Sequence, residues 1–505
     1  MREQLALLPG LLLAHVQLTL AALFTGTALA VPAGILVRRV LWLEASLLGV
    51  AAVIQTVPAL ALLAIMVPLL SAFGLPGIGW LPAFLGLVLY SLLPILRNTV
   101  TGLAGVDPAA IEAARGVGMT RGQRLRMVEL PLALPVVIAG VRTATVWTVG
   151  MATLSTPVGA PSLGNYIFSG LQTRNLDAVL VGCVAAAALA LLLDGLVRAL
   201  ARGFERRRRG LVLTGTVGLL LLAGWALLVP VVGARGGGER PIRIGTKTFT
   251  EQYILGEILA GQVRRAARMG TEVVSSLGST VAFDALARGE IDAYVDYTGT
   301  IWATILKKTG KLPGRAELLA EVRLWLEETH GIGLVASLGF ENAYAFAIRR
   351  AEADARGVRR LSDLVPYARH LAAAGDYEFW SRREWAAVSE VYGIDFAERR
   401  SIDPSLMYAA AAAGQVDVIV AFSSDGRIAA YDLVTLEDDR GAIPPYDAVV
   451  LVSRALSEQR PEAVAALSAL EGRIDITRMR ALNRAVDEDG QSPAAVAHGF
   501  LADLP

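Results

Sequence analysis

Cysteine, histidine and charged residues are all scarce in this chain of 505 residues. The single cysteine, Cys183, excludes an intrachain disulfide and any cysteine-rich zinc site. The four histidines lie far apart in the sequence, so no local ligand spacing indicates a metal centre. Charged residues make up 18% of the chain, against ~25% in an ordinary soluble domain, which argues against disorder and against an all-soluble enzyme. A net charge of +1 predicts no bulk attraction to nucleic acid.

Sequence signatures of catalysis and of nucleotide binding are also lacking. The chain has no G-x-S-x-G elbow and no Ser/His/Asp series. Its one Gly-Lys pair, Gly310-Lys311, continues with Leu312 and lacks the earlier glycine of a P-loop. The sequence therefore predicts neither an enzyme nor an ATPase, and it indicates no cofactor.

Long apolar runs dominate the chain up to about Val232, whereas from about Glu239 onward it is typical of a mixed α/β soluble protein. A helix needs ~20 apolar residues to cross the hydrocarbon core of a bilayer. Six segments satisfy this length: Leu11–Val37, Ser46–Leu70, Trp80–Leu96, Leu132–Leu154, Ala178–Val197 and Leu211–Val232. The first half is therefore predicted to be an all-α, multi-pass domain embedded in the lipid bilayer.

Arginines mark alternate loops of this domain. They follow the first, third and fifth candidate spans, at Arg38-Arg39, between Arg97 and Arg126, and at Arg202 and Arg206–Arg209. Because cytoplasmic loops carry the excess of Lys and Arg, the N-terminus is predicted to lie outside. The sixth span then runs outward, so the soluble half works outside the cytoplasm, tethered by the Gly-rich segment Gly233–Gly238.

Two polar residues of the predicted spans have expected partners. Asp194 lies one helical turn before Arg198, a spacing that favours an ion pair. Arg142 is deeper in its span and is expected to face a protein interior rather than lipid, with a role in the transport pathway left open.

The longest cytoplasmic loop contains signals for two short helices. Asp107-Pro108 is a helix start, with Asp as the N-cap and Pro at the first helical position. This helix is expected to end at Gly116 and Gly118. Thr120 and Gln123 have the spacing of a capping box, which predicts a second short helix reaching Leu130-Pro131.

The loop also resembles the E-A-A-x3-G-x9-I-x-L-P signature of ABC importer permeases. The matching residues are Glu112, Ala113, Ala114, Gly118, Val128 (in place of the usual Ile), Leu130 and Pro131. The resemblance implies a type I importer permease fold of about six spans. It also implies that the loop is a coupling helix that docks on a separate, homodimeric ABC ATPase subunit, and that a second copy of this chain completes the pathway.

The external half contains an internal repeat. Residues 287–297 and 412–422 both read as a helix end, a glycine and then a strand ending in an aromatic residue, Tyr297 in one copy and Phe422 in the other. Earlier, Ile242–Ile244 alternates like a strand, and Thr248 with Glu251 predicts a capping box for a helix over 249–267. If each lobe holds one copy, the two aromatics face each other across a cleft; the alternative is that both are core residues.

From Ile242 to the C-terminus the chain resembles the substrate-binding proteins of osmoprotectant importers, which take glycine betaine, choline or carnitine. The matching segments are 248–257, 296–300, 423–427, 436–439 and 444–446, and residues 55–58 and 94–99 resemble the permeases of the same systems. The resemblance implies a cage of Tyr297, Tyr344, Phe422 and Tyr446, because aromatic faces attract quaternary ammonium ions. It places the side-chain oxygen of Asn342 near the cation, and Arg382, Thr300 and Gln252 near the cleft.

The domain organisation follows from these matches. We expect a permease domain over 1–200 with its coupling loop at 97–131, then a basic loop, the sixth span and a linker over 201–238. An extracytoplasmic, periplasmic-binding-protein-like domain follows over 239–505, with one lobe at about 241–341 and 446–505 and the other at about 342–445. The predicted function is a permease of the bacterial inner membrane fused to its binding domain, in an ATP-driven importer of quaternary ammonium compounds. The same fused architecture resembles ergothioneine importers, and a membrane-anchored ligand sensor is the alternative from another class.

Overall fold

The computed structural model describes residues 2–38, 41–173, 175–233, 240–306, 313–376 and 379–504. Arg39, most of the predicted linker Gly233–Gly238 and the pair Gly310-Lys311 lie outside these ranges. The chain divides into a helical N-terminal unit and an α/β C-terminal unit.

Long apolar helices build the N-terminal unit. They are α1 (Arg2–Val37), α2 (Leu41–Thr56), α3 (Ala59–Ala72), α4 (Trp80–Ala104), α7 (Leu130–Ala152), α9 (Leu176–Glu205) and α10 (Arg209–Gly233). Five helical stretches in the described chain have the length and composition to cross a membrane, and α2 with α3 forms a sixth candidate that is bent by 101°. The shorter elements α8 (Gly164–Gln172) and the 3₁₀ helix η2 (Thr153–Val158) connect α7 to α9.

The predicted second span is a broken one. The helix stops at Thr56 and restarts at Ala59, with Pro58 in an extended conformation (ψ 136°) between the two parts. Proline has no N–H to donate, and it disfavours helical geometry in the residue before it, which explains the break. Basic residues follow both α1 and α4, which indicates that the C-terminal ends of these two helices face the cytoplasm. This requires the bent pair α2 and α3, which lies between them in the chain, to cross the membrane once.

Close packing and one ion-pair cluster hold the long helices together. A Cβ on Gly140 of α7 would lie only 2.7 Å from the carbonyl oxygen of Pro94 in α4. The backbones of α4 and α7 are therefore close enough at this point to require a glycine. Asp194 of α9 pairs with Arg198 (2.5 Å), which confirms the expected pair, and also with Arg142 of α7 (2.9 Å). Arg142 therefore faces protein, as predicted.

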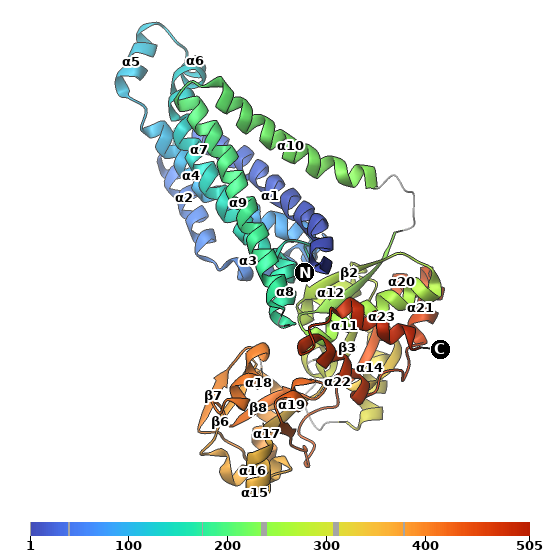
Figure 1. Cartoon of the computed structure of the whole chain (residues 1–505). Coiled ribbons are helices and arrows are strands. Elements are labelled where there is room, and N and C mark those ends of the chain that lie inside the picture. The colour runs from blue at the N-terminus through green and yellow to red at the C-terminus, as the bar shows by residue number, and fades with distance from the viewer. Residues whose placement is uncertain are drawn as a thin grey trace. The chain divides into compact units, whose positions relative to one another are not determined.

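The cytoplasmic loop begins as expected and continues differently. The Asp107 side chain caps α5 (Pro108–Gly116), Gly118 has a left-handed φ of +79°, and Thr120 with Gln123 forms the predicted capping box of α6 (Arg121–Arg124). The prediction of a separate second helix ending at Pro131 is wrong. A π-helical turn, η1 (Leu125–Glu129), leads directly into α7, and Pro131 falls in the first turn, where its missing N–H is tolerated. Figure 1 shows α5 and α6 projecting from one end of the helices.

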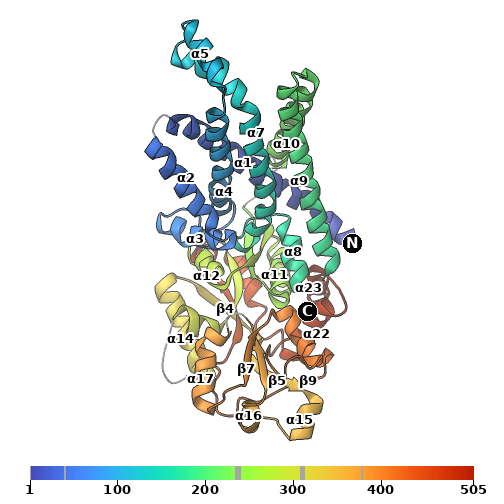
Figure 2. The ribbon, with the colours of Figure 1, turned by 90° about the vertical axis from the view of Figure 1, so that its left-hand side faces the viewer.

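Two five-stranded sheets form the C-terminal unit, one in each lobe. The first has the order β2-β1-β3-β10-β4 and the second the order β7-β6-β8-β5-β9. Figure 2 shows β7, β5 and β9 of the second sheet. In both, the first three strands are parallel and the last two are antiparallel to their neighbours. The strands are β1 (Ile242–Lys247), β2 (Thr271–Leu277), β3 (Ala293–Tyr297), β4 (Gly333–Glu341), β5 (Tyr344–Arg349), β6 (Ala372–Gly375), β7 (Glu398–Ser401), β8 (Val418–Phe422), β9 (Leu433–Thr435) and β10 (Asp447–Val452).

Helices surround both sheets. In the first lobe they are α11 (Thr250–Gln262), η3 (Val263–Ala267), α12 (Ser279–Ala287), α13 (Thr298–Thr300), η4 (Ile301–Ile305), α14 (Arg315–His330), α20 (Arg454–Gln459), α21 (Pro461–Ser468), α22 (Ile476–Asp487) and α23 (Pro493–Ala502). In the second they are α15 (Arg350–Arg356), α16 (Leu361–Ala368), η5 (Phe379–Ser381), α17 (Arg383–Tyr392), α18 (Pro404–Ala412) and α19 (Arg427–Ala430). Buried apolar side chains such as Ile244, Ile258, Phe346 and Val450 join both lobes in one core cluster.

The internal repeat is confirmed by the backbone. Gly289 and Gly414 follow α12 and α18 with left-handed φ angles of +70° and +71°, which only glycine adopts without strain. The strands that follow them, β3 and β8, are the central strands of their sheets. Tyr297 and Phe422 therefore stand at equivalent strand ends.

One predicted cap is wrong. The N-cap of α11 is Phe249 rather than Thr248, and it makes no side-chain capping hydrogen bond. The Glu251 side chain is buried and bonded to residues of other elements, so it is not available to close a capping box.

Candidate ligand-binding site

A cavity of about 310 Å³ lies at the carboxyl ends of the parallel strands of both sheets. Thr248 and Phe249 follow β1, Tyr297 ends β3, Asp376 follows β6 and Phe422 ends β8, and all line the cavity. This edge of a parallel sheet is where α/β folds bind ligands, because loops and side chains converge there.

Five rings form what we call the aromatic end of the cavity: Phe249, Tyr297, Tyr344, Phe422 and Tyr446. The ring of Phe249 lies 6.2 Å from that of Tyr297 and 6.5 Å from that of Phe422, measured between centroids. Tyr344 lies 5.4 Å from Phe422 and 6.1 Å from Tyr446. The rings therefore make one continuous wall contributed by both sheets.

Seven of the eight residues expected near the ligand line this cavity: Tyr297, Thr300, Asn342, Tyr344, Arg382, Phe422 and Tyr446. Gln252 is buried behind it and donates to the Tyr297 hydroxyl and to the Val295 carbonyl, both at 3.1 Å. Its position supports the Tyr297 ring rather than a ligand.

Charged groups already flank several of the rings. The Lys247 ammonium, paired with Asp296 at 2.5 Å, lies 5.4 Å from the ring centre of Tyr297. The Arg382 guanidinium lies 5.8 Å from the ring centre of Tyr344. The Tyr446 hydroxyl donates to Glu384, and burial together with this carboxylate raises the pKa of Tyr446 well above its usual range. The rings of Tyr297 and Tyr344 therefore each already have a protein cation within 6 Å of their centres.

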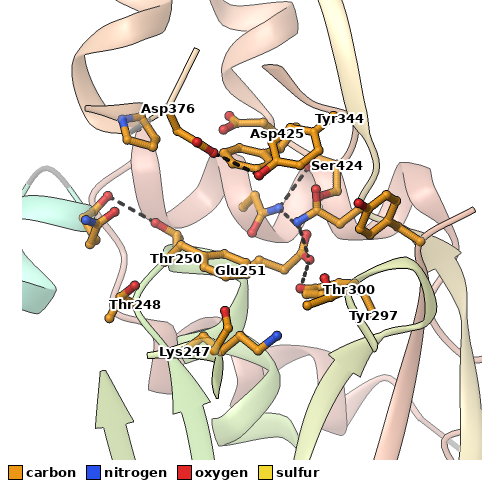
Figure 3. A pocket seen from close by; sticks show the side chains of 18 of the residues that line it. Lys247, Thr248, Thr250, Glu251, Tyr297, Thr300, Tyr344, Asp376, Ser424 and Asp425 are labelled. Atoms are coloured by element: carbon orange, nitrogen blue, oxygen red, sulfur yellow. Dashed lines mark hydrogen bonds between the residues drawn. The ribbon is translucent and has the colours of Figure 1, made fainter. Parts of the chain in front are cut away.

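Glu251 is the buried centre of the site (Figure 3). Its Oε1 accepts from the Tyr297 hydroxyl (2.5 Å) and from Asn342 (3.0 Å), and its Oε2 accepts from Asn483 (3.2 Å). Burial raises the pKa of Glu251, opposed by hydrogen bonds from Ser424, Tyr297, Asn483 and Asn342. The Glu251 carboxylate of the first lobe therefore bonds to Asn342, which lies between β4 of the first sheet and β5 of the second, and to Ser424 of the second lobe.

A second group of side chains forms what we call the polar end of the cavity: Thr250, Ser424, Asp425, Arg427, Asn483 and Asp487. Arg427 makes two bonds to Asp425, at 2.9 and 2.5 Å, and lies 4.0 Å from Asp487. The Thr250 hydroxyl donates to Asp487 at 2.7 Å. Glu251 connects the two ends, with Oε1 toward the aromatic end and Oε2 toward the polar end.

Asp487 gives the fold a pH dependence that can be measured. Burial raises its pKa to about 6 from 3.8, against the opposing charge of Arg427. Between about pH 4 and 6 the folded chain holds a proton that the unfolded chain has released, so this group's contribution to stability falls as pH rises through that window. When the pH rises from about 4 to above 6, the unfolding free energy of the wild type should fall by up to about 3 kcal/mol relative to that of Asp487→Asn. Parallel pH profiles of thermal unfolding for the two proteins would contradict this.

Sequence reasoning missed Phe249, Glu251 and Asn483. Phe249 and Glu251 lie inside the matched segment 248–257, where Glu251 was interpreted as a cap. Asn483 lies on α22 beside the buried residues Met479, Leu482 and Val486. Two polar residues four positions apart, Asn483 and Asp487, on a largely apolar face of α22 were the available signal for it. Among the described residues, no group of three or more His, Cys, Asp and Glu side chains is arranged to hold a metal ion.

The residues of the coupling signature lie on and beside the projecting loop. Glu112 and Ala113 are exposed on α5 while Ala114 is buried, and the apolar side chains of Val117 (74% exposed) and Met127 (64% exposed) face outward.

At the base of the loop, Leu130 packs against a cluster containing Leu103 of α4. Glu129 pairs with Arg124 at 2.6 Å and with Arg38, at the end of α1, at 3.9 Å. Val128 and Pro131 stand in the same continuous helix. The loop is thus anchored to three long helices and leaves an apolar face uncovered.

One chain thus joins a multi-span helical unit with such a loop to a two-lobed unit with a ligand cavity. This combination defines a binding-protein-dependent membrane transporter. Residues 26–209 match the family described as the inner membrane component of binding-protein-dependent transport systems. Residues 240–503 match the substrate binding domain of ABC-type glycine betaine transport systems.

Three relatives illustrate the match. The ergothioneine transport permease/ergothioneine binding protein EgtU of Helicobacter pylori (strain G27) is 31% identical over 481 residues, covering 91% of this chain and 84% of the relative. The choline transport system permease protein OpuBB of Bacillus subtilis (strain 168) is 42% identical over 180 residues, covering 36% of this chain and 80% of the relative. The carnitine transport binding protein OpuCC of Listeria monocytogenes is 32% identical over 275 residues, covering 53% and 88%.

The chain belongs to the family of ABC importer permeases fused to a substrate-binding domain of the glycine betaine transport type. It is accordingly a multi-pass protein of the inner membrane, with the binding domain outside the cytoplasm. Membership also implies an ABC ATPase partner and a transported ligand.

Proposed function

We propose that this chain captures and imports quaternary ammonium compounds, driven by a separate ABC ATPase subunit. The observation that carries the proposal is the aromatic end of the cavity, where Tyr297 and Phe422 lie at equivalent ends of the two central strands. A quaternary ammonium ion has no N–H to donate, so ring faces replace its hydration by cation–π attraction. Asn342 supports this, because it lines the same cavity and its buried side-chain oxygen has no hydrogen-bond partner.

The ATPase is proposed to dock on the loop around α5. The exposed Glu112, Ala113 and Val117 offer a mixed apolar and charged face for it. We propose that Glu129, bridging Arg124 and Arg38, passes movement of the loop to α1, while Leu130 passes it to α4. Because such pathways form between two permease domains, a second copy of this chain is proposed to complete the transporter.

Ergothioneine is the second candidate ligand. The Helicobacter pylori relative EgtU is named as an ergothioneine transport permease and ergothioneine binding protein, and its alignment extends over both the permease and the binding domain of this chain. Ergothioneine also bears a trimethylammonium group, so the aromatic end suits it by the same cation–π chemistry.

Calorimetric titration of the purified full chain in lipid nanodiscs tests the proposed ligand class. The panel is choline, glycine betaine, carnitine, proline betaine and ergothioneine, with ethanolamine as the matched primary amine of choline. At least one trimethylammonium compound should bind, and choline should bind more tightly than ethanolamine. Binding of ethanolamine alone, or of none of the panel, would refute the assignment.

A further inference from the structure

The polar end of the cavity contains a hydrogen-bond acceptor that nothing in the protein satisfies. Five buried side-chain atoms of the described residues have no hydrogen-bond partner: Thr19 Oγ1, Trp302 Nε1, Asn342 Oδ1, Asp447 Oδ2 and Asn483 Oδ1. Asn342 and Asn483 are residues of the cavity wall, whereas Thr19, Trp302 and Asp447 are not. A buried acceptor without a partner is costly, so an unsatisfied acceptor on a residue that lines a ligand cavity indicates a ligand group that donates to it.

The orientation of the Asn483 amide is fixed by its neighbours. Its Nδ2 donates to Glu251 Oε2 at 3.2 Å and to the backbone carbonyl of Ser424 at 3.0 Å. Both protons of the amide are therefore used on oxygens that accept. Turning the amide over would place its oxygen against both of these acceptors, so Oδ1 remains on the side away from them.

The charges around Asn483 select the kind of group that can approach. Arg427 is the one cation of the polar end, and it is already committed to Asp425 through two bonds and to the Pro404 carbonyl at 3.1 Å. Asp425, Asp487 and the central Glu251 supply three carboxyl groups. A ligand carboxylate placed here would meet these acids without an uncommitted cation, whereas a hydroxyl or an N–H group would find acceptors in these carboxyl groups and in Asn483 Oδ1.

We propose that the transported ligand carries, besides its quaternary ammonium group, a hydroxyl or N–H donor that bonds to Asn483 Oδ1 at the polar end. The inference rests on the proposed function, since it assumes that the ammonium group occupies the aromatic end beside Asn342. Glu251 joins the two positions through its two oxygens. Choline and carnitine carry a hydroxyl and ergothioneine carries ring N–H groups, whereas glycine betaine and proline betaine have no donor.

Matched ligand pairs test this on the unmodified full chain. The first two pairs differ by one hydroxyl: choline and ethyltrimethylammonium, and carnitine and γ-butyrobetaine. The third pair is ergothioneine and its ring N-methylated form, in which a methyl group replaces the N–H hydrogen. A lost bond to a buried acceptor should weaken binding by roughly ten- to a hundredfold in the pairs that bind. Equal affinities within every binding pair would overturn the inference and leave the proposed function intact. No binding in any pair would also overturn the inference, and the proposed function would then depend on whether glycine betaine or proline betaine binds.

Asn483→Ala assigns the effect to this residue. The ratio of affinities for choline and ethyltrimethylammonium should fall from tenfold or more to about one. The matched control is Gln262→Ala, which removes another buried amide, bonded to the Ala466 carbonyl at 3.2 Å and outside the cavity. That variant should keep the wild-type ratio. If Asn483→Ala keeps it as well, the acceptor is not Asn483, and the proposal is wrong.

Discussion

Gly118→Pro is expected to abolish uptake while the affinity of the external domain for its ligand stays unchanged. Gly118 joins α5 to α6 with a φ of +79°, and proline fixes φ near −65°, so the substitution must reorient the projecting loop. Glu112→Lys is expected to have the same effect for a different reason, since it reverses a charge on the exposed face of α5. Uptake is compared in cells at equal membrane levels of each variant, and affinity by calorimetry.

Gly116→Ala is the matched control for the loop. Gly116 is the last residue of α5, and a Cβ there meets no atom within 4 Å, so alanine fits without moving the loop. This variant should transport normally. Normal uptake by both Gly118→Pro and Glu112→Lys would remove the coupling role from the loop.

Phe422→Ala is expected to weaken binding of a quaternary ammonium ligand by roughly ten- to a hundredfold. A desolvated cation–π contact is worth ~2 kcal/mol or more, and every ~1.4 kcal/mol is tenfold in affinity. Phe422 suits the test better than Tyr297 because it is only partly buried and has no hydroxyl, whereas Tyr297 is buried and donates to Glu251. Its removal should therefore leave the fold intact.

Two comparisons separate a binding role for Phe422 from a packing role. Phe422→Tyr keeps the ring and should retain most of the affinity. Tyr367→Ala removes a half-exposed ring of α16 that contacts Arg356 outside the cavity, and it should leave affinity unchanged. A Phe422→Ala protein that melts at a much lower temperature but binds as tightly as the wild type would make Phe422 a core residue only.

Much of the fold could be predicted because it depends on local signals. Gly289 and Gly414 mark the same turn in both lobes, and that turn fixes where the central strands begin. The long apolar helices follow from composition alone. The errors arise where tertiary contacts override a local pattern. Thr120 caps a helix that continues into α7 through a π-helical turn, and Glu251, at a capping position, is buried among donors from other elements.

The aromatic end of the site was predictable from the repeat and the resemblance together. The repeat pointed to Tyr297 and Phe422 at equivalent strand ends, and the resemblance to osmoprotectant-binding proteins added Tyr344 and Tyr446. The polar end was not predictable, because its members come from α11, α22 and the segment after β8, and only the fold brings them together. Asn483 in particular is 232 residues from Glu251, to which it donates.

ATP-driven uptake into proteoliposomes tests the central claim most directly. The full chain is reconstituted with the ABC ATPase subunit that co-purifies with it, and accumulation of radiolabelled choline, carnitine and ergothioneine is followed. We expect at least one of these ligands to accumulate only when ATP is present on the ATPase side, and Phe422→Ala to reduce uptake at low ligand concentration. Accumulation without ATP, or ATP-dependent transport that excludes every quaternary ammonium compound, would contradict the account.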